Sequence, residues 1–251
     1  VLKLMGYTEI DILIIVISSV FLGGIIKGAV GIGMSMFSVP IIAFFLPPTT
    51  AIIYLCFPVL STNILQMQVH KGIGSFRFLP MFIALVIGLI IGCNLILEIN
   101  FSTISIIIAL SIIFSSSFNF LGLSFKNIDP KFEKKITIIL GFFSGIIGGI
   151  SNMYSPYILA YLVGLKLDKE FLIRTMAIMY FIGSIIIYPL WIYNGLGTIN
   201  DLLMSFFLIM PAIIGQFLGT KIRNKIPNEL FTKIILSTLM LMGVSLLIKN
   251  L

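Results

Sequence analysis

Long apolar runs with few charges recur along the chain. The longest uncharged interval has 43 residues, from Gly28 to His70, and another has 30 residues, from Ile136 to Leu165. Four further uncharged intervals of 19 to 27 residues follow the same pattern. A helix crosses the hydrocarbon core of a bilayer with about 20 mostly apolar residues. The pattern therefore predicts an all-α polytopic membrane protein.

Charged residues, prolines and glycines divide the chain into ten predicted helical elements. In chain order these cover residues 10–27, 34–46, 50–70, 78–97 and 101–122, and then 136–148, 152–163, 171–193, 202–220 and 229–248. Five elements fall in each half. We therefore predict one membrane domain with a first repeat over residues 1–125, a cytoplasmic linker over 126–135 and a second repeat over 136–251.

Glycines and prolines of the two halves correspond in position. A shift of 116 residues aligns Gly33 with Gly149 and Pro40 with Pro156. A shift of 123 residues aligns Gly92 with Gly215. Corresponding loops of the two halves carry different charges, which indicates that they lie on opposite sides of the membrane. The halves are thus predicted to be inverted repeats, a common plan of secondary transporters.

The basic residues are concentrated in four loops. The loops 71–77, 126–135, 166–174 and 221–233 contain 13 of the 16 lysines and arginines. Because positive loops of membrane proteins stay in the cytoplasm, we place these four loops there and both chain termini outside the cytoplasmic (inner) membrane. The net charge of +7 then reflects orientation and does not indicate nucleic-acid binding.

Each half opens with a glycine-rich hairpin that looks too short for two full crossings. The centres of the hairpins cover residues 27–35 and 145–152. Glycine weakens a helix by roughly 1 kcal/mol relative to alanine, and unwound backbone inside a membrane has to be buried in protein or line a polar cavity. We predict broken or re-entrant hairpins whose tips meet near the midplane and offer free N–H groups to an anion.

Close helix packing is the alternative interpretation of these glycines. Small residues spaced four apart let membrane helices approach closely. Packing is the preferred interpretation for the pairs Gly88/Gly92, Gly141/Gly145 and Gly215/Gly219.

The candidate substrate-binding residues lie in and beside the two hairpins. Lys27 is a basic residue inside a predicted membrane segment, where a charge is costly. It either binds an anionic substrate or extends its stem to the membrane interface. Asn63, Gln66 and His70 share one helical face and can line a polar path. The predicted set is Lys27, Gly28, Gly31, Gly33, Ser35, Asn63, Gln66, Gly148, Gly149, Ser151 and Asn152.

Some kinds of chemistry find no support in the sequence. Every acidic residue falls in a loop or at the end of a segment, so no buried carboxylate offers a proton relay or a sodium ligand. There is no Walker sequence, and His70 is the only histidine. We predict a protein that is not an enzyme, with no cofactor and no metal site. Tyr188, Trp191 and Tyr193 are predicted to form an aromatic belt at the membrane interface.

The glycine and proline motifs resemble those of the sulfite exporter family of TauE/SafE-type permeases. In the first half the resemblance rests on residues 23–28, 31–33, 39–40, 47–51, Asn63 and 72–74, and in the second half on Gly145, 148–149, Pro156, 164–171 and Thr175. It implies transport of sulfite, sulfoacetate and other small sulfur anions, and it adds Thr175 to the predicted substrate-binding residues.

These observations together predict a secondary transporter or exporter of a small anion, sulfite or an organosulfonate. The partners implied are this anion and the lipid bilayer, with room for a homodimer and no role for nucleic acid. Two alternatives stay open. One is a permease for a neutral or cationic small solute. The other is a non-transporting membrane subunit in which the glycines serve only packing.

Overall fold

The computed structural model describes residues 8–67, 76–120, 130–165, 167, 169–223, 240, 244 and 247–248, and these residues form helices and their connections without any strand. The α-helices are α1 (Glu9–Val30), α2 (Met34–Phe45), α3 (Pro48–Ile53), α4 (Cys56–Met67), α5 (Leu79–Leu95), α6 (Phe101–Phe120), α7 (Pro130–Ser151), α8 (Ser155–Gly164), α9 (Lys169–Tyr193), α10 (Ile199–Phe207) and α11 (Ile209–Ile222). Two short 3₁₀ helices, η3 (Phe76–Phe78) and η4 (Ile96–Glu98), flank α5.

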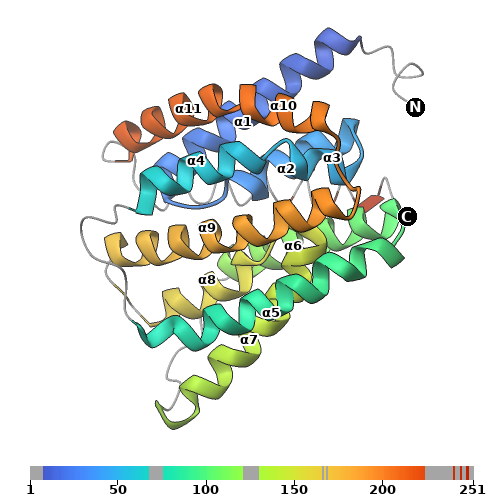
Figure 1. The fold of residues 1–251 in the computed structure, drawn as a ribbon. Coiled ribbons are helices and arrows are strands. Elements are labelled where there is room, and N and C mark those ends of the chain that lie inside the picture. Colours follow the sequence, from blue (N-terminus) through green and yellow to red (C-terminus); the bar gives the residue numbers. More distant parts are fainter. Residues whose placement is uncertain are drawn as a thin grey trace.

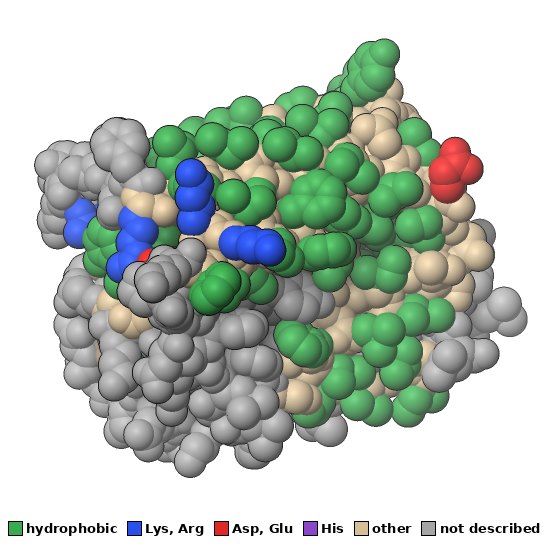
Figure 2. All heavy atoms as spheres, turned by 90° about the horizontal axis from the view of Figure 1, so that it is seen from below, with side chains coloured by type: hydrophobic (Ala, Val, Ile, Leu, Met, Phe, Trp, Pro, Cys, Tyr) green, Lys and Arg blue, Asp and Glu red, His purple; other side chains and the backbone are tan. Residues whose placement is uncertain are grey.

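Six stretches of the described chain are long and apolar enough to cross a membrane. They are Glu9–Val30, Pro48–Met67, Leu79–Glu98, Phe132–Ser151, Phe171–Tyr193 and Ile199–Ile222. Their outward surface is apolar, as expected where lipid is the solvent. Figure 2 shows hydrophobic side chains over the middle of one face, with lysines and arginines gathered toward one end and an acidic side chain at the other. The protein is a membrane protein with several apolar helices.

Three predicted elements differ from the observed helices. The element predicted over 136–148 is wrong at its start, because α7 begins at Pro130 and includes Lys131, Lys134 and Lys135, which we assigned to the linker. The elements predicted over 50–70 and 202–220 are each divided in two, at Tyr54–Leu55 and at Leu208. Nearly all of the element predicted over 229–248 lies outside the described residues, as do His70 and the turn at 72–74.

The first arm of each glycine-rich hairpin is longer than predicted. Both α1 and α7 have 22 residues, and each contains one of the membrane-capable stretches. Only the returning arms are short, with 12 residues in α2 and 10 in α8. The sequence indicated that the whole hairpin is too short for two crossings. In the structure only its second arm is short.

The most extensive helix pairs join the two halves of the chain. Helix α1 packs against α11 along one edge of the bundle, and α5 packs against α7 along the opposite edge (Figure 1). Helices α4 and α9 contact each other between these pairs. The first helix of each half is thus held mainly by a helix near the end of the other half.

Glycines make both pairs possible because the backbones nearly touch. A Cβ added to Gly28 of α1 would lie 2.1 Å from the backbone carbonyl oxygen of Gln216 in α11. One added to Gly219 would lie 2.0 Å from the backbone carbonyl oxygen of Ile25. In the other pair, a Cβ added to Gly92 would lie 2.2 Å from the Ile146 oxygen. The packing interpretation of Gly88/Gly92, Gly141/Gly145 and Gly215/Gly219 is confirmed. In both pairs the contacts advance in the same direction along the two helices, so each pair is parallel.

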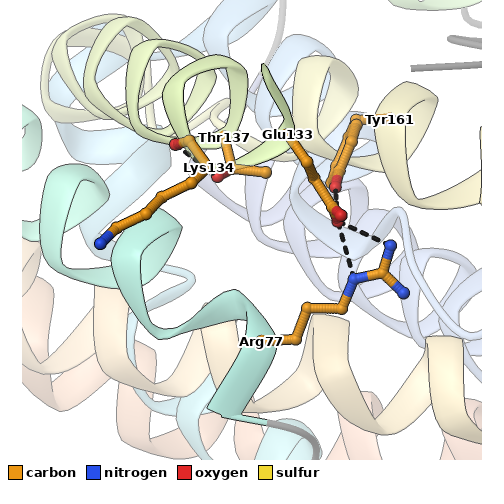
Figure 3. Close-up of polar contacts among 5 residues, drawn as sticks. All are labelled: Arg77, Glu133, Lys134, Thr137 and Tyr161. Carbon is orange, nitrogen blue, oxygen red and sulfur yellow. Dashed lines mark hydrogen bonds and ion pairs between the residues drawn. The ribbon is translucent and has the colours of Figure 1, made fainter. Parts of the chain in front are cut away.

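A polar cluster ties α7, α8 and the start of α5 together at the basic end of the bundle (Figure 3). The Glu133 Oε1 atom accepts hydrogen bonds from Arg77 Nε and from the Tyr161 hydroxyl, each at 2.7 Å. Arg77 Nη2 also lies 2.7 Å from the same oxygen. The neighbouring Lys134 points away from this cluster in Figure 3. One carboxylate thus holds three segments of the chain in place.

We expect Glu133→Gln to lower the free energy of unfolding by about 1–2 kcal/mol. Hydrogen bonds to a charged group are worth roughly 1.5–3 kcal/mol, and the partial exposure of Arg77 reduces the ion-pair share. Thermal unfolding of the detergent-solubilised protein measures the effect. The neighbouring variant Lys134→Gln changes an exposed residue and should leave the melting temperature unchanged; equal melting temperatures for both variants would contradict the prediction.

Candidate substrate-binding site

Lys27 is buried in the last turn of α1. Its side chain is 3% exposed and donates a hydrogen bond to Oδ1 of Asn63 in α4. Its Nζ atom also lies 5.6 Å from the ring centroid of Tyr180 in α9, where the face of the ring attracts a cation. The side chain therefore does not extend to the membrane interface, and that alternative is wrong. Among the described residues no acidic side chain forms an ion pair with Lys27.

The first helix break lies at residues 31–33, next to this lysine. Gly31 and Gly33 have φ angles of 96° and 104°, a backbone conformation that favours glycine. The Gln66 Nε2 atom donates to the Gly31 oxygen at 2.7 Å and so ties α4 to the break. Gly28 remains inside α1, so the break is shorter than the sequence indicated.

Helix α2 begins inside the protein without a capping side chain. Its N-cap residue is Gly33, and Met34, Ser35 and Met36 in the first turn are all buried. The first N–H groups of a helix have no partner within the helix. The N-terminus of α2 therefore brings unpaired donors and a positive dipole end into the interior.

The second break lies at residues 152–154, so α7 continues through Gly148 and Gly149. Asn152 adopts a left-handed conformation with φ of 59°, and its Nδ2 donates to the Tyr188 hydroxyl at 3.2 Å. The Ser151 hydroxyl donates to the Ile147 oxygen at 2.8 Å. These two side chains are engaged within the protein.

The tips of the two hairpins touch. The Ser155 hydroxyl at the start of α8 lies 3.9 Å from the sulfur of Met36 in the first turn of α2. The hydroxyl of Tyr154, from the second break, donates to the backbone carbonyl oxygen of Tyr180 at 3.2 Å, and the centroids of the two rings are 5.2 Å apart. Tyr180 in turn faces Lys27. The second break therefore reaches the neighbourhood of the lysine through these aromatic rings.

Three buried polar atoms near Lys27 lack a hydrogen-bond partner within the described chain. They are Asn63 Nδ2, Gln66 Oε1 and Gln216 Oε1. The Gln216 Nε2 atom donates to the backbone carbonyl oxygen of Thr62 at 3.1 Å. This bond places Gln216, from α11, beside Asn63. Leaving a buried polar group unpaired costs about 1–3 kcal/mol, so such a cluster calls for an explanation. A polar ligand that binds there explains it.

A cavity of about 280 Å³ lies beside this cluster, between α4, α9 and α11. Its wall consists of Leu65, Gln66, Ile173, Ile213, Gln216, Phe217, Thr220 and Arg223. Arg223 donates from Nε and Nη2 to the Gly28 oxygen, at 3.1 and 2.8 Å, and so lies next to the turn that carries Lys27. Lys27 itself does not line the cavity, but Arg223 connects the cavity to the helical turn that carries the lysine.

Comparison with protein-family models decides the family of the chain. Residues 16–246 match the model described as sulfite exporter TauE/SafE, which covers nearly the whole chain. The chain belongs to the TauE/SafE sulfite exporter family. Comparisons with curated proteins and with solved structures gave no match. The family is one of transporters, so the chain is a membrane transport protein.

Within this TauE/SafE protein the predicted substrate-binding residues separate into two groups. Lys27, Gly31, Asn63 and Gln66 lie together around the first break, and Gln66 also lines the cavity. Others serve the packing or bond within their own helix. Gly28 and Gly149 lie against α11 and α5, Gly148 makes room for the Tyr154 ring, and the Thr175 hydroxyl donates to the Phe171 oxygen at 2.8 Å.

The predicted aromatic belt is wrong for two of its three members. Trp191 and Tyr188 are 0% and 2% exposed, and only Tyr193 is exposed. The Trp191 Nε1 atom donates to the Gly149 oxygen at 2.9 Å. Both residues are buried because α9 lies between α4 and α5, so its C-terminal half has neighbours on two sides.

Four further residues of the candidate site were not predicted from the sequence. Tyr154, Tyr180, Gln216 and Arg223 all come from the second half of the chain and contact the residues around Lys27. Gln216 did have a signal in the sequence, because it is a lone amide within an uncharged apolar segment. The described residues contain no group of three His, Cys, Asp or Glu side chains that could hold a metal ion.

Proposed function

We propose that this protein is a secondary transporter of a small sulfur anion, sulfite or an organosulfonate, across the cytoplasmic membrane. The observation that carries the proposal is the burial of Lys27 with no acidic partner in the described chain. A buried charge is stable only when an opposite charge and hydrogen bonds compensate its lost hydration. A bound oxyanion supplies both.

Three kinds of donor converge on such an anion. Lys27 provides the charge, and the unpaired Nδ2 atom of Asn63 provides a hydrogen bond. The uncapped N-terminus of α2 adds backbone N–H groups and the positive end of a helix dipole. Ser35 lies in that first turn and is buried, so its hydroxyl is available to the same ligand within this proposal.

We also propose that the two halves are inverted repeats, with α2 and α8 as re-entrant arms. Matching lengths of α1 and α7, and short returning arms after both, support this arrangement. So do the two parallel pairs that join the halves. Basic residues lie at the C-terminal end of α11 and at the N-terminal ends of α5 and α7. With that basic end in the cytoplasm, α1 runs inward and α7 runs outward.

The membrane potential is the proposed driving force. A potential that is negative inside favours exit of an anion by about 2.3 kcal/mol per charge per 100 mV. The acidic residues whose side chains the structure describes lie at helix ends. Among them there is no buried carboxylate that could bind a coupling sodium ion or proton.

Flux into and out of proteoliposomes tests the proposal. We expect efflux of labelled sulfite to accelerate when a potassium diffusion potential makes the lumen negative, and to slow when the potential is reversed. Liposomes without protein provide the control. Flux of a neutral amino acid or a metal cation, in the absence of any sulfite or sulfonate flux, would contradict the proposal in favour of a different solute class.

A further inference from the structure

The unpaired atoms around the cavity are of two opposite kinds. Asn63 Nδ2 is a hydrogen-bond donor, whereas Gln66 Oε1 and Gln216 Oε1 are acceptors. The orientation of both glutamine amides follows from their partners, because each Nε2 atom donates to a backbone oxygen, of Gly31 and of Thr62. In each glutamine the oxygen is therefore the atom that remains for a ligand.

The two acceptors belong to the same place in the fold. Gln66 follows Asn63 by one turn of α4, and Gln216 of α11 is bonded to the carbonyl of residue 62. Both glutamines line the cavity, and Asn63, one turn before Gln66, is the hydrogen-bond partner of Lys27. A small ligand held by Lys27 and Asn63 and extending into this cavity thus meets a donor side and an acceptor side.

An anion that carries only acceptor atoms fits this arrangement poorly. Its oxygens satisfy Lys27 and the Asn63 amide, but they leave the glutamine oxygens unpaired and face them with like partial charge. A buried group left unpaired in this way is a strong means of rejecting a competing ligand. An anion with an O–H or N–H group satisfies both sides.

We propose, on the basis of the function proposed above, that Gln66 and Gln216 make the transporter selective for sulfur monoanions that carry a hydrogen-bond donor. Hydrogen sulfite and hydroxy-substituted sulfonates belong to this class, whereas sulfate and unsubstituted alkyl sulfonates do not. The cavity volume of about 280 Å³ is large enough for a sulfonate with a short carbon chain. Its apolar wall, which includes Ile173, Ile213 and Phe217, suits the carbon atoms.

Two sulfonates that differ by one hydroxyl group test the selectivity. Ethanesulfonate and 2-hydroxyethanesulfonate have the same charge and nearly the same size, and each is added as a competitor of labelled sulfite flux in proteoliposomes. We expect the hydroxylated compound to inhibit at a concentration at least tenfold lower, and sulfate to inhibit poorly. Equal inhibition by the two sulfonates would overturn this inference alone. Absence of flux of both labelled sulfite and labelled 2-hydroxyethanesulfonate would overturn the proposed function and this inference together.

Variants of the glutamines assign the selectivity to these residues. Gln66→Met and Gln216→Met keep the length of the side chain and remove the acceptor, so the advantage of the hydroxylated compound should fall to about twofold while ethanesulfonate still inhibits. Asn94→Leu removes an exposed amide of α5 and should leave the advantage intact. A full advantage in both glutamine variants would overturn the assignment. Since the comparison of the two sulfonates uses the natural chain, it stands even if a variant fails to fold.

Discussion

Replacing Lys27 with glutamine is expected to reduce sulfite flux by about ten- to a hundredfold. Hydrogen bonds to a charged group are worth roughly 1.5–3 kcal/mol, and each 1.4 kcal/mol corresponds to about a factor of ten. The effect should fall on anion affinity, because glutamine can still bond to Asn63 but brings no charge to the site. Concentration-dependent flux in proteoliposomes, measured at a fixed membrane potential, shows this loss.

The control for Lys27→Gln is Lys134→Gln, which removes the same charge from an exposed position at the start of α7. This control should transport at the rate of the unmodified chain. We also expect the melting temperature of the Lys27 variant to stay the same or rise, since a buried ammonium without an acidic partner is costly. Undiminished sulfite flux in Lys27→Gln would remove the lysine from the binding site.

A methyl group at either close helix contact is expected to destabilise the whole bundle. In Gly219→Ala the new Cβ would lie 2.0 Å from the Ile25 oxygen, and in Gly92→Ala 2.2 Å from the Ile146 oxygen. Backbone atoms cannot move aside as a side chain does, so the helices have to separate. Overpacking of this kind costs about 1–3 kcal/mol or more, which outweighs the gain of roughly 1 kcal/mol in helix propensity. Thermal unfolding in detergent should show a lower melting temperature for both.

Gly197→Ala provides the matched control for these glycines. Its new Cβ would lie 3.1 Å from Cγ1 and Cδ1 of Ile53, side-chain atoms that need to shift by only a few tenths of an ångström. We expect little change in its melting temperature. If Gly219→Ala and Gly92→Ala were as stable as Gly197→Ala, the close approach of α1 to α11 and of α5 to α7 would be wrong.

The sequence predicted the membrane class, most helix positions and the residues at the centre of the candidate site. Lys27 was identifiable because a charge in an apolar run is rare, and Asn63 and Gln66 because polar residues at helical spacing share a face. The start of α7 was missed for a related reason. Charged residues end an apolar run, but they do not end a helix that continues beyond the hydrocarbon core.

The sequence could not assign each glycine to packing or to a break. Gly28 and Gly31 have similar neighbours in the chain, yet one lies against α11 and the other ends α1. The difference depends on Gln216, far away along the chain. The same holds for Trp191, whose burial follows from the helices on either side of α9 and not from its own position near a segment end.

The parallel pair of α1 and α11 has a consequence for the order of events during synthesis. The contact of Gly24 with Ala212 joins a membrane segment with another that is made much later. At about 5–20 residues per second, the ribosome needs on the order of 10–40 s to make the chain between them. During that time the glycine face of α1 lacks the helix that packs against it, whereas α5 and α7 are made within a shorter interval. Two interfaces of the same construction thus form at different times, and the N-terminal half is completed only by the C-terminal half.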